Sequence, residues 1–173
     1  AYSSLEEFIN SISEKICTRS STVAMIGRIT HQKNSLIIFE LAKLMPHVQF
    51  IYIGDNGELK PDFLNNLNSF KLSNLTYMPN IDDLKLFYSN IDLLIAPSIH
   101  EGLPYVVLEA LCNYIPVVLS PIPPFIDLFN IFQSPLLNFP YISSSGAISI
   151  SDYVKCIESV LGASRVAAAM ILN

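Results

Sequence analysis

Short apolar runs alternate along the chain with longer segments in which apolar residues recur at helical spacing. Each run is bounded by Gly, Pro or polar residues, which predicts buried strands at 22–26, 48–53, 75–78, 92–96 and 117–119. The intervening segments predict helices at 35–45, 58–72, 81–88 and 104–115. Strands that alternate with helices indicate a parallel sheet covered on both faces, and therefore an α/β fold.

The two ends of the chain predict further elements. Residues 3–16 form a predicted short helix, and we assign residues 1–21 to a linker with this helix. Residues 22–173 form one predicted Rossmann-like domain. Within it, we expect a last strand at 136–139 and two helices at 151–161 and 165–172, the second apolar enough to dock on another domain.

The stretch from residue 95 to residue 118 predicts a ligand site. Its strand ends at Pro97, and Pro104 suits the first turn of the following helix. In an open α/β sheet, ligands bind beyond the carboxyl ends of the strands, and the free N–H groups of a helix start favour an anion such as phosphate. Gly102 lets a ligand approach the backbone closely.

Two carboxylates, Glu101 and Glu109, flank this predicted anion site. They would repel phosphate, but they can accept hydrogen bonds from hydroxyl groups. A nucleotide-sugar has phosphate in its middle and hydroxyl groups at both ends, so it fits the pattern. Each glutamate also has a simpler explanation: the helix dipole favours Glu101 at the helix start, and Glu109 is an ordinary exposed helical residue.

Composition favours a folded domain with an unusually small fraction of charged residues. Hydrophobic residues make up 51% of the 173 residues and charged residues only 14%, against about 25% in ordinary domains. A face that meets another domain or a membrane would explain the low charge. The net charge of −5 argues against nucleic acid as a partner, although a nucleotide needs only a few local cations.

The cysteines, the histidines and the length of the apolar runs further restrict the class of protein. Three cysteines, far apart in the sequence, suit reduced thiols in the cytoplasm. The three histidines lack metal-ligand spacing, so we predict no metal site. No apolar run approaches about 18 uninterrupted residues, so no membrane-spanning helix is expected. Ala1 in place of an initiator methionine suggests that the chain comes from a longer protein.

The stretch Pro-Ser-Ile-His-Glu-Gly-Leu-Pro-Tyr-Val-Val-Leu-Glu-Ala carries the E-x7-E pattern. It resembles the donor-site loop and helix of retaining glycosyltransferases of the GT-B fold, most closely family 4. The resemblance covers about residues 22–120 and implies the C-terminal, nucleotide-sugar-binding half of such an enzyme. It assigns Glu109 to the ribose hydroxyls, Glu101 to the transferred sugar, and the backbone N–H groups of Gly102 and Leu103 to the phosphate or the sugar.

A second segment, from Gly27 to Lys33, carries the same resemblance. In the family, Gly-Arg ends the first strand and a Lys follows at the helix start, and both cations bind the donor diphosphate. Arg28 can form a bidentate hydrogen-bonded contact with phosphate oxygens, and Lys33 adds a point charge. On spacing alone, both are ordinary surface cations. The resemblance therefore implies catalytic roles for Arg28, Lys33 and Glu101, without a metal or other cofactor.

The sequence departs from the family at two turns. Where the family has Gly-Asp-Gly, this chain has Gly54-Asp55-Asn56-Gly57, so the nucleotide contact expected of Gly54 and Asp55 depends on how the turn accommodates Asn56. A plain turn after the strand explains Asp55 at least as well as a nucleotide contact does. Tyr114 replaces a glycine after the donor-site helix, and we expect Asn113 to adopt the left-handed conformation there.

Residues 121–124 form a third departure. They contain three prolines where the family often has a small Gly-rich turn before an acidic helix start. Prolines stiffen a loop and remove N–H donors, so we expect a rigid loop here that makes no phosphate contact.

Together, these features predict the donor-binding domain of a retaining glycosyltransferase that transfers a hexose to a glycan or lipid-linked acceptor. We expect an N-terminal domain outside this chain to hold the acceptor, and the chain alone to catalyse little. The expected location is the cytoplasm, with peripheral association at the inner face of the membrane through that N-terminal domain. Bacterial surface-polysaccharide synthesis is the expected context.

Three alternatives remain open at this point. The first is a degenerate glycosyltransferase-like module that binds or assembles without catalysis, which the three departures would favour. The second is a sugar-nucleotide epimerase of related architecture, which fits the E-x7-E helix less well. The third is a generic flavodoxin-like protein, which leaves the charged residues unexplained.

Overall fold

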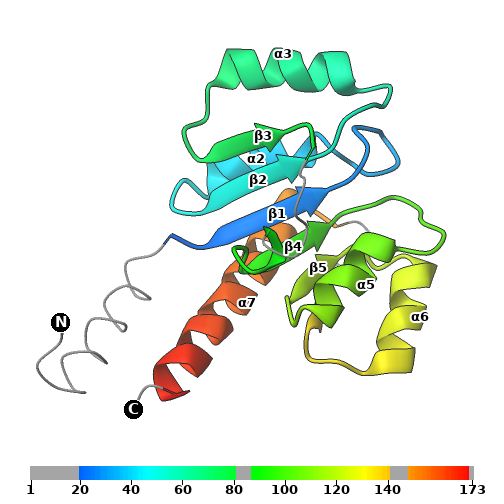
Figure 1. The fold of residues 1–173 in the computed structure, drawn as a ribbon, viewed down its shortest axis with the longest axis vertical. Coiled ribbons are helices and arrows are strands. Elements are labelled where there is room, and N and C mark those ends of the chain that lie inside the picture. The colour runs from blue at the N-terminus through cyan, green and yellow to red at the C-terminus, as the bar shows by residue number, and fades with distance from the viewer. Residues whose placement is uncertain (1–19, 81–86, 141–147, 172–173) are drawn as a thin grey trace, which may run out of the picture.

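The computed structural model of the chain describes residues 20–80, 87–140 and 148–171. These residues contain a single parallel sheet with the strand order β3-β2-β1-β4-β5-β6 (Figure 1). The strands span β1 (Thr22–Ile26), β2 (Gln49–Ile53), β3 (Leu75–Met78), β4 (Leu93–Ala96), β5 (Val117–Leu119) and β6 (Leu137–Asn138). The sheet confirms the predicted Rossmann-like α/β fold.

The strand order reverses next to β1, and this places the ends of β1 and β4 side by side. β1 pairs with β2 along its whole length, through contacts such as Met25 with Tyr52, and with β4 through Val23 and Ala24. The chain leaves β1 toward one face of the sheet and β4 toward the other. The loops that follow these strands therefore border a crevice at the carboxyl edge, where open α/β sheets bind their ligands.

Helices cover both faces of the sheet, as predicted (Figure 1). One face packs against α2, α3 and α7, and the other against α5 and α6. The helices span α2 (Ile37–Leu44), α3 (Lys60–Phe70), α5 (Tyr105–Cys112), α6 (Pro123–Phe132) and α7 (Ile150–Ile171).

Alternation along the central strands divides the core into two clusters. In β1, Val23 and Met25 pack with α2, while Ala24 packs with α5 on the opposite face. β4 repeats this pattern, with Ile95 on the first face and Leu94 on the second. Successive side chains of a strand point to opposite faces, so a buried parallel strand must be apolar at every position. This requirement explains the continuous apolar runs that predicted the strands.

Two C-terminal elements differ from the prediction. The segment after Pro121 was expected to be a rigid loop, but α6 begins at Pro123 and continues to Phe132. Prolines are tolerated in the first helical turn because their missing N–H would be unpaired there, and Phe125 and Leu128 supply the buried face. The two helices predicted at 151–161 and 165–172 form the single helix α7.

Some predictions lie outside the described residues. The helix predicted at 3–16 is among them, and so is most of the helix predicted at 81–88, of which residues 87 and 88 are described as helical. The division of the chain at residue 21 also stays a prediction.

The end of α5 corrects the prediction for Asn113 and Tyr114. Asn113 has a φ of −96°, whereas Tyr114 itself adopts the left-handed conformation with a φ of 59°. The Ile115 N–H donates to the carbonyl of Ala110 and the Tyr114 N–H to that of Leu111, which is the hydrogen-bond pattern of a Schellman motif. Tyr114 thus occupies the position that normally favours glycine.

We predict that Tyr114→Gly stabilises the chain, because glycine adopts this conformation without steric cost. The Tyr114 side chain is 83% exposed, so its removal loses little packing. The free energy of unfolding should rise by about 1 kcal/mol in urea denaturation. Tyr114→Ala is the control, since it removes the ring but keeps the strained Cβ. Equal stability of the Gly and Ala variants would contradict this explanation.

Candidate functional site

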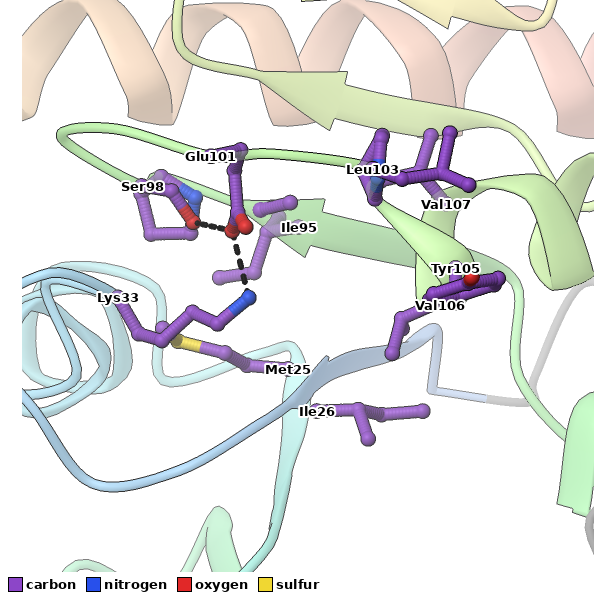
Figure 2. A pocket seen from close by; sticks show the side chains of 13 residues that line it. Met25, Ile26, Lys33, Ile95, Ser98, Glu101, Leu103, Tyr105, Val106 and Val107 are labelled. Atoms are coloured by element: carbon purple, nitrogen blue, oxygen red, sulfur yellow. Dashed lines mark hydrogen bonds and ion pairs between the residues drawn. The ribbon is translucent and has the colours of Figure 1, made fainter. Parts of the chain in front are cut away.

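A hollow of about 150 Å³ opens between the carboxyl ends of β1 and β4 (Figure 2). Its walls are mostly apolar, and its polar groups come from Lys33, Ser98, Glu101 and the hydroxyl of Tyr105. Lys33 reaches toward Glu101 on one side of the hollow, and Leu103 and Tyr105 lie on the other. The loop after β4 thus contributes to a site at the edge of the sheet where we predicted one.

An ion pair between Lys33 and Glu101 links the loops that follow β1 and β4. Lys33 Nζ lies 2.5 Å from Glu101 Oε1, and the Ser98 hydroxyl donates to the same oxygen at 2.6 Å. The Glu101 side chain is only 8% exposed and that of Lys33 is 22% exposed. Removing a carboxylate from water is costly unless charged and hydrogen-bonding partners compensate, and Lys33 and Ser98 supply both.

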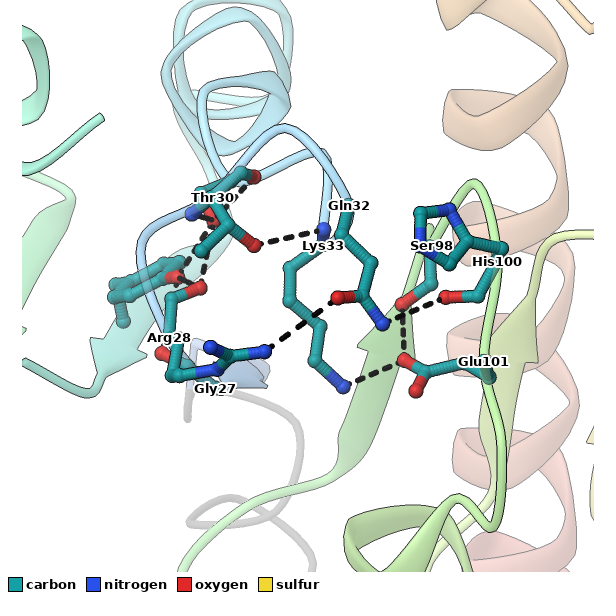
Figure 3. A network of polar contacts seen from close by, with 10 residues as sticks. Gly27, Arg28, Thr30, Gln32, Lys33, Ser98, His100 and Glu101 are labelled. Carbon is teal, nitrogen blue, oxygen red and sulfur yellow. Dashed lines mark hydrogen bonds and ion pairs between the residues drawn. The ribbon is translucent and has the colours of Figure 1, made fainter. Parts of the chain in front are cut away.

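Gln32 connects the same two loops through its backbone and its side chain (Figure 3). Its carbonyl accepts a hydrogen bond from the Ile99 N–H at 2.8 Å, and its side-chain amide donates to the carbonyl of His100 at 3.1 Å. Arg28 lies at the other end of this network, 3.5 Å from the Gln32 side-chain oxygen. Gln32 therefore fixes the spacing between the two predicted diphosphate-binding cations and the Glu101 loop.

A second, wider hollow of about 580 Å³ lies beyond the ends of β1, β2 and β3. It adjoins the segments that the sequence assigned to the nucleotide, and its lining residues are Ile26, Gly27, Arg28, Ile53, Gly54, Asp55, Asn56, Pro79 and Asn80. The fold therefore brings the predicted Gly-Arg segment and the predicted glycine turn to one surface.

The glycine turn packs directly against the loop after β1. A Cβ on Gly54 would lie 1.9 Å from the carbonyl oxygen of Gly27, so only glycine fits there. Asn56 has a φ of 63°, a left-handed conformation that Asn tolerates better than most residues, and its carbonyl accepts the Ile29 N–H at 2.8 Å. The turn thus accommodates Asn56 in a left-handed backbone conformation.

Asp55 is engaged by a neighbour on α3. Its carboxylate forms an ion pair with Lys60 and lies 3.5 Å from the Tyr77 hydroxyl. The hydrogen bond from Lys60 lowers the pKa of Asp55. These contacts attach the turn to α3. They agree with the alternative explanation, in which Asp55 belongs to a plain turn after the strand.

Glu109 lies on α5 and is held by a buried tyrosine. The Tyr88 hydroxyl donates to Glu109 Oε2 at 3.0 Å, and burial, followed by the nearby carboxylate, raises the pKa of Tyr88. Glu109 does not line either hollow. Its predicted role toward the ribose would therefore depend on how a nucleotide extends beyond these hollows.

The loop glycine Gly102 faces open space, since an added Cβ would meet no atom within 4 Å. Leu103 beside it is 60% exposed. A ligand can therefore approach the backbone of Gly102, as its predicted contact requires. Ser98 and Gln32 also take part in these contacts but were not predicted as site residues. Gln32 precedes Lys33 in the sequence, and Ser98 forms a hydrogen bond with Glu101.

The described residues offer neither a metal site nor a membrane-spanning helix. They contain no cluster of three or more His, Cys, Asp or Glu side chains suited to a metal ion. None of the helices in the described segments is long and apolar enough to cross a membrane.

Comparison with known proteins identifies the family. Residues 20–130 match the family model of glycosyl transferases group 1, so the chain belongs to this family. It is 31% identical over 131 residues to the O-antigen biosynthesis glycosyltransferase WclY of Escherichia coli, covering 75% of this chain and 36% of that protein.

A second Escherichia coli relative is named UDP-Gal:alpha-D-GlcNAc-diphosphoundecaprenol alpha-1,3-galactosyltransferase. It is 33% identical over 110 residues, which cover 58% of this chain and 28% of that protein. Among solved structures, the fold resembles WaaG, a glycosyltransferase involved in lipopolysaccharide biosynthesis, with a TM-score of 0.65 and 15% identity over 94% of this chain and 43% of WaaG. The chain thus spans about a third of the length of these curated relatives. The predicted resemblance to a GT-B glycosyltransferase is confirmed for family and fold.

We predict that the Lys33–Glu101 pair stabilises the fold as a unit. Lys33→Met should lower the free energy of unfolding by about 2 kcal/mol, below the roughly 3–5 kcal/mol of a fully buried pair because water still reaches Lys33. The double variant Lys33→Met with Glu101→Gln should recover at least half of this loss, since no unpaired charge remains buried.

Urea denaturation measures both changes. Lys155→Met on α7 is the control, because Lys155 is exposed and its loss should change stability by no more than about 0.5 kcal/mol. Additive effects in the double variant would show that the two residues do not stabilise each other.

Proposed function

We propose that this domain binds the nucleotide-sugar donor of a retaining glycosyltransferase. The observation that carries the proposal is the convergence of Arg28, Lys33 and Glu101 on the edge of the sheet where the strand order reverses. Two cations suit a diphosphate, and a carboxylate beside them suits sugar hydroxyls. The name of the galactosyltransferase relative, which includes UDP-Gal, supports a nucleotide-sugar donor.

In this proposal, the two hollows receive different parts of the donor. The diphosphate lies near Arg28 and Lys33 at their boundary, and Glu101 holds the transferred hexose. Gly102 and Leu103 offer backbone N–H groups, and Glu109 binds the ribose. Before the donor arrives, Lys33 and Ser98 hold the Glu101 carboxylate in place.

Departure of the nucleoside diphosphate concentrates negative charge on the phosphate that leaves the sugar. Arg28, Lys33 and the start of α5 would stabilise that charge because they are already in place before reaction, which is electrostatic catalysis without a metal ion. This role makes Arg28 and Lys33 catalytic residues as well as binding residues.

Transfer itself needs an acceptor, which we assign to a part of the protein outside this chain. The relatives are about three times as long as the matched segment, which leaves room for an acceptor domain. The relatives' names support a glycan or lipid-linked acceptor in bacterial surface-polysaccharide synthesis. A cytoplasmic protein that associates with the inner membrane surface through the acceptor domain fits this function.

A degenerate module without catalysis is the second candidate, based on the departures from the family pattern. The turn geometry weakens it, because Asn56 and Tyr114 both adopt the left-handed backbone that a glycine would take. The intact set of Arg28, Lys33, Glu101 and Glu109 also argues against it.

We predict that one nucleoside diphosphate stabilises the chain thermally. UDP, GDP and ADP, together with the monophosphate CMP, should be compared in a thermal unfolding assay. At about 100 times its dissociation constant, the bound nucleotide should add roughly 2.7 kcal/mol of stability. Arg28→Ala should lower this gain to about 1.4 kcal/mol if affinity falls tenfold, since a two-pronged contact with phosphate is lost.

Lys155→Ala supplies the matched control, because it removes an exposed cation on α7 that lines neither hollow. It should leave the nucleotide effect unchanged. If Lys155→Ala reduced the effect as much as Arg28→Ala, the nucleotide would be responding to net charge rather than to this site. If no nucleotide stabilised the wild type, the degenerate module would be favoured.

We further predict that the 173-residue chain alone transfers little or no sugar to an acceptor. A radiolabelled UDP-sugar assay can compare it with the longer protein that contains an acceptor domain. Comparable transfer rates for both would contradict the assignment of the acceptor to another domain.

A further inference from the structure

Two buried hydroxyls turn the carbonyl groups of the β1–α2 loop toward the core. Tyr52 and Ser35 are both completely buried. The Tyr52 hydroxyl oxygen lies 3.2 Å from the carbonyl oxygen of Gly27 and 3.1 Å from that of Arg28. Ser35 Oγ lies 3.1 Å from the Arg28 carbonyl oxygen and 3.2 Å from that of Thr30. The loop that carries the predicted diphosphate-binding cations is thus held in place by side chains of the core.

The two hydroxyls form one connected network. The Tyr52 hydroxyl oxygen and Ser35 Oγ lie 2.9 Å apart, and Ser35 Oγ accepts the Thr30 N–H at 3.0 Å. Each hydroxyl has one proton, so Tyr52 can donate to the Gly27 carbonyl while Ser35 donates to the Arg28 carbonyl. Burial raises the pKa of Tyr52 to about 12, so its hydroxyl keeps its proton at neutral pH. Removing a hydroxyl group from water costs free energy unless the group forms hydrogen bonds in the protein. Here the loop carbonyls are the partners.

The direction of these carbonyls determines what the loop presents outward. In a trans peptide, the N–H points opposite to the C=O. Because the Gly27 carbonyl faces Tyr52, the Arg28 N–H points away from Tyr52, and both Gly27 and Arg28 line the wider hollow. The next N–H, that of Ile29, is already used by the Asn56 carbonyl. The outward face of the loop therefore presents an N–H group and a guanidinium rather than carbonyl oxygens.

We propose that Tyr52 and Ser35 are positioning residues for recognition of the donor diphosphate. They hold the carbonyl oxygens of Gly27 and Arg28 in the core, where these negative dipole ends cannot repel phosphate. The Arg28 N–H can then face the diphosphate together with the guanidinium, whose contact with Gln32 is long at 3.5 Å. This inference rests on the proposed function and adds to it a backbone contact and the two side chains that create it.

The chain contains a matched pair for comparison. Tyr153 on α7 lies 2.9 Å from the Ser120 hydroxyl, and both are buried. Tyr153 belongs to the same core cluster as Tyr52, but its hydroxyl partner lies after β5 rather than in the β1–α2 loop. Tyr153→Phe therefore removes a buried tyrosine–serine hydrogen bond of equal length without altering the loop.

The test titrates the full chain with UDP and with uridine, using NMR chemical shifts. Tyr52→Phe should weaken UDP binding at least about tenfold, the equivalent of one hydrogen bond to a charged group. Uridine lacks phosphate, so its affinity should change less than about twofold. Ser35→Ala should act in the same direction, and Tyr153→Phe should affect neither ligand. In the wild type, inorganic pyrophosphate should shift the Arg28 amide signal, and Tyr52→Phe should reduce this shift.

Three results would overturn the inference. One is unchanged UDP affinity in both Tyr52→Phe and Ser35→Ala, which would leave the proposed function intact. Another is an equal loss for uridine and UDP, which would indicate a general loss of structure. The third is an Arg28 amide signal that pyrophosphate does not move. If the wild type bound no UDP, GDP or ADP, the proposed function itself would be refuted. Ser35→Ala keeps the test informative if Tyr52→Phe does not fold.

Discussion

The pairing of β1 with β2 on one side and β4 on the other is the constraint on which the site depends. Because the strand order reverses at β1, the loops that follow β1 and β4 leave toward opposite faces and border a crevice. Three of the interactions described at the site cross or support this crevice. The Lys33–Glu101 ion pair spans it, Gln32 bridges it, and the buried hydroxyl of Tyr52 supports one of its walls.

In the proposed function, the same crevice lets groups of opposite charge serve one ligand. Glu101 is almost buried, so it needs Lys33 and the Ser98 hydroxyl to offset the loss of water. A diphosphate that arrives beside Lys33 would compete with Glu101 for the ammonium group and leave the carboxylate available to sugar hydroxyls. The fold thus keeps both groups in place before the donor binds, which avoids the cost of arranging them afterwards.

Much of the fold could be predicted because parallel strands buried on both faces must be apolar throughout. Arg28 and Glu101 could be singled out because each lies in the loop after such a strand and because the motifs around them resemble a known family. The helix α6 was missed because its prolines indicated a loop, although Phe125 and Leu128 carried helical spacing. Tyr114 could not be predicted, since a bulky residue in a left-handed conformation goes against local preference and requires the rest of the helix end to impose it.

The roles of Gln32, Ser35 and Tyr52 could not be read from the sequence for a different reason. Their partners are backbone carbonyls in the loops after β1 and β4, and these acquire a direction only when β1 has paired with β2 and β4. A tyrosine in an apolar strand predicts burial but does not tell what its hydroxyl will meet. Side chains that act through the backbone of a binding loop therefore become visible only in the structure.

A crystal structure of the chain with bound UDP would test the central claim most directly. The account predicts that the diphosphate lies at the crevice between the loops after β1 and β4, within hydrogen-bonding distance of Arg28 and Lys33. A nucleotide bound elsewhere, with the Lys33–Glu101 pair unchanged and no contact to either cation, would contradict it.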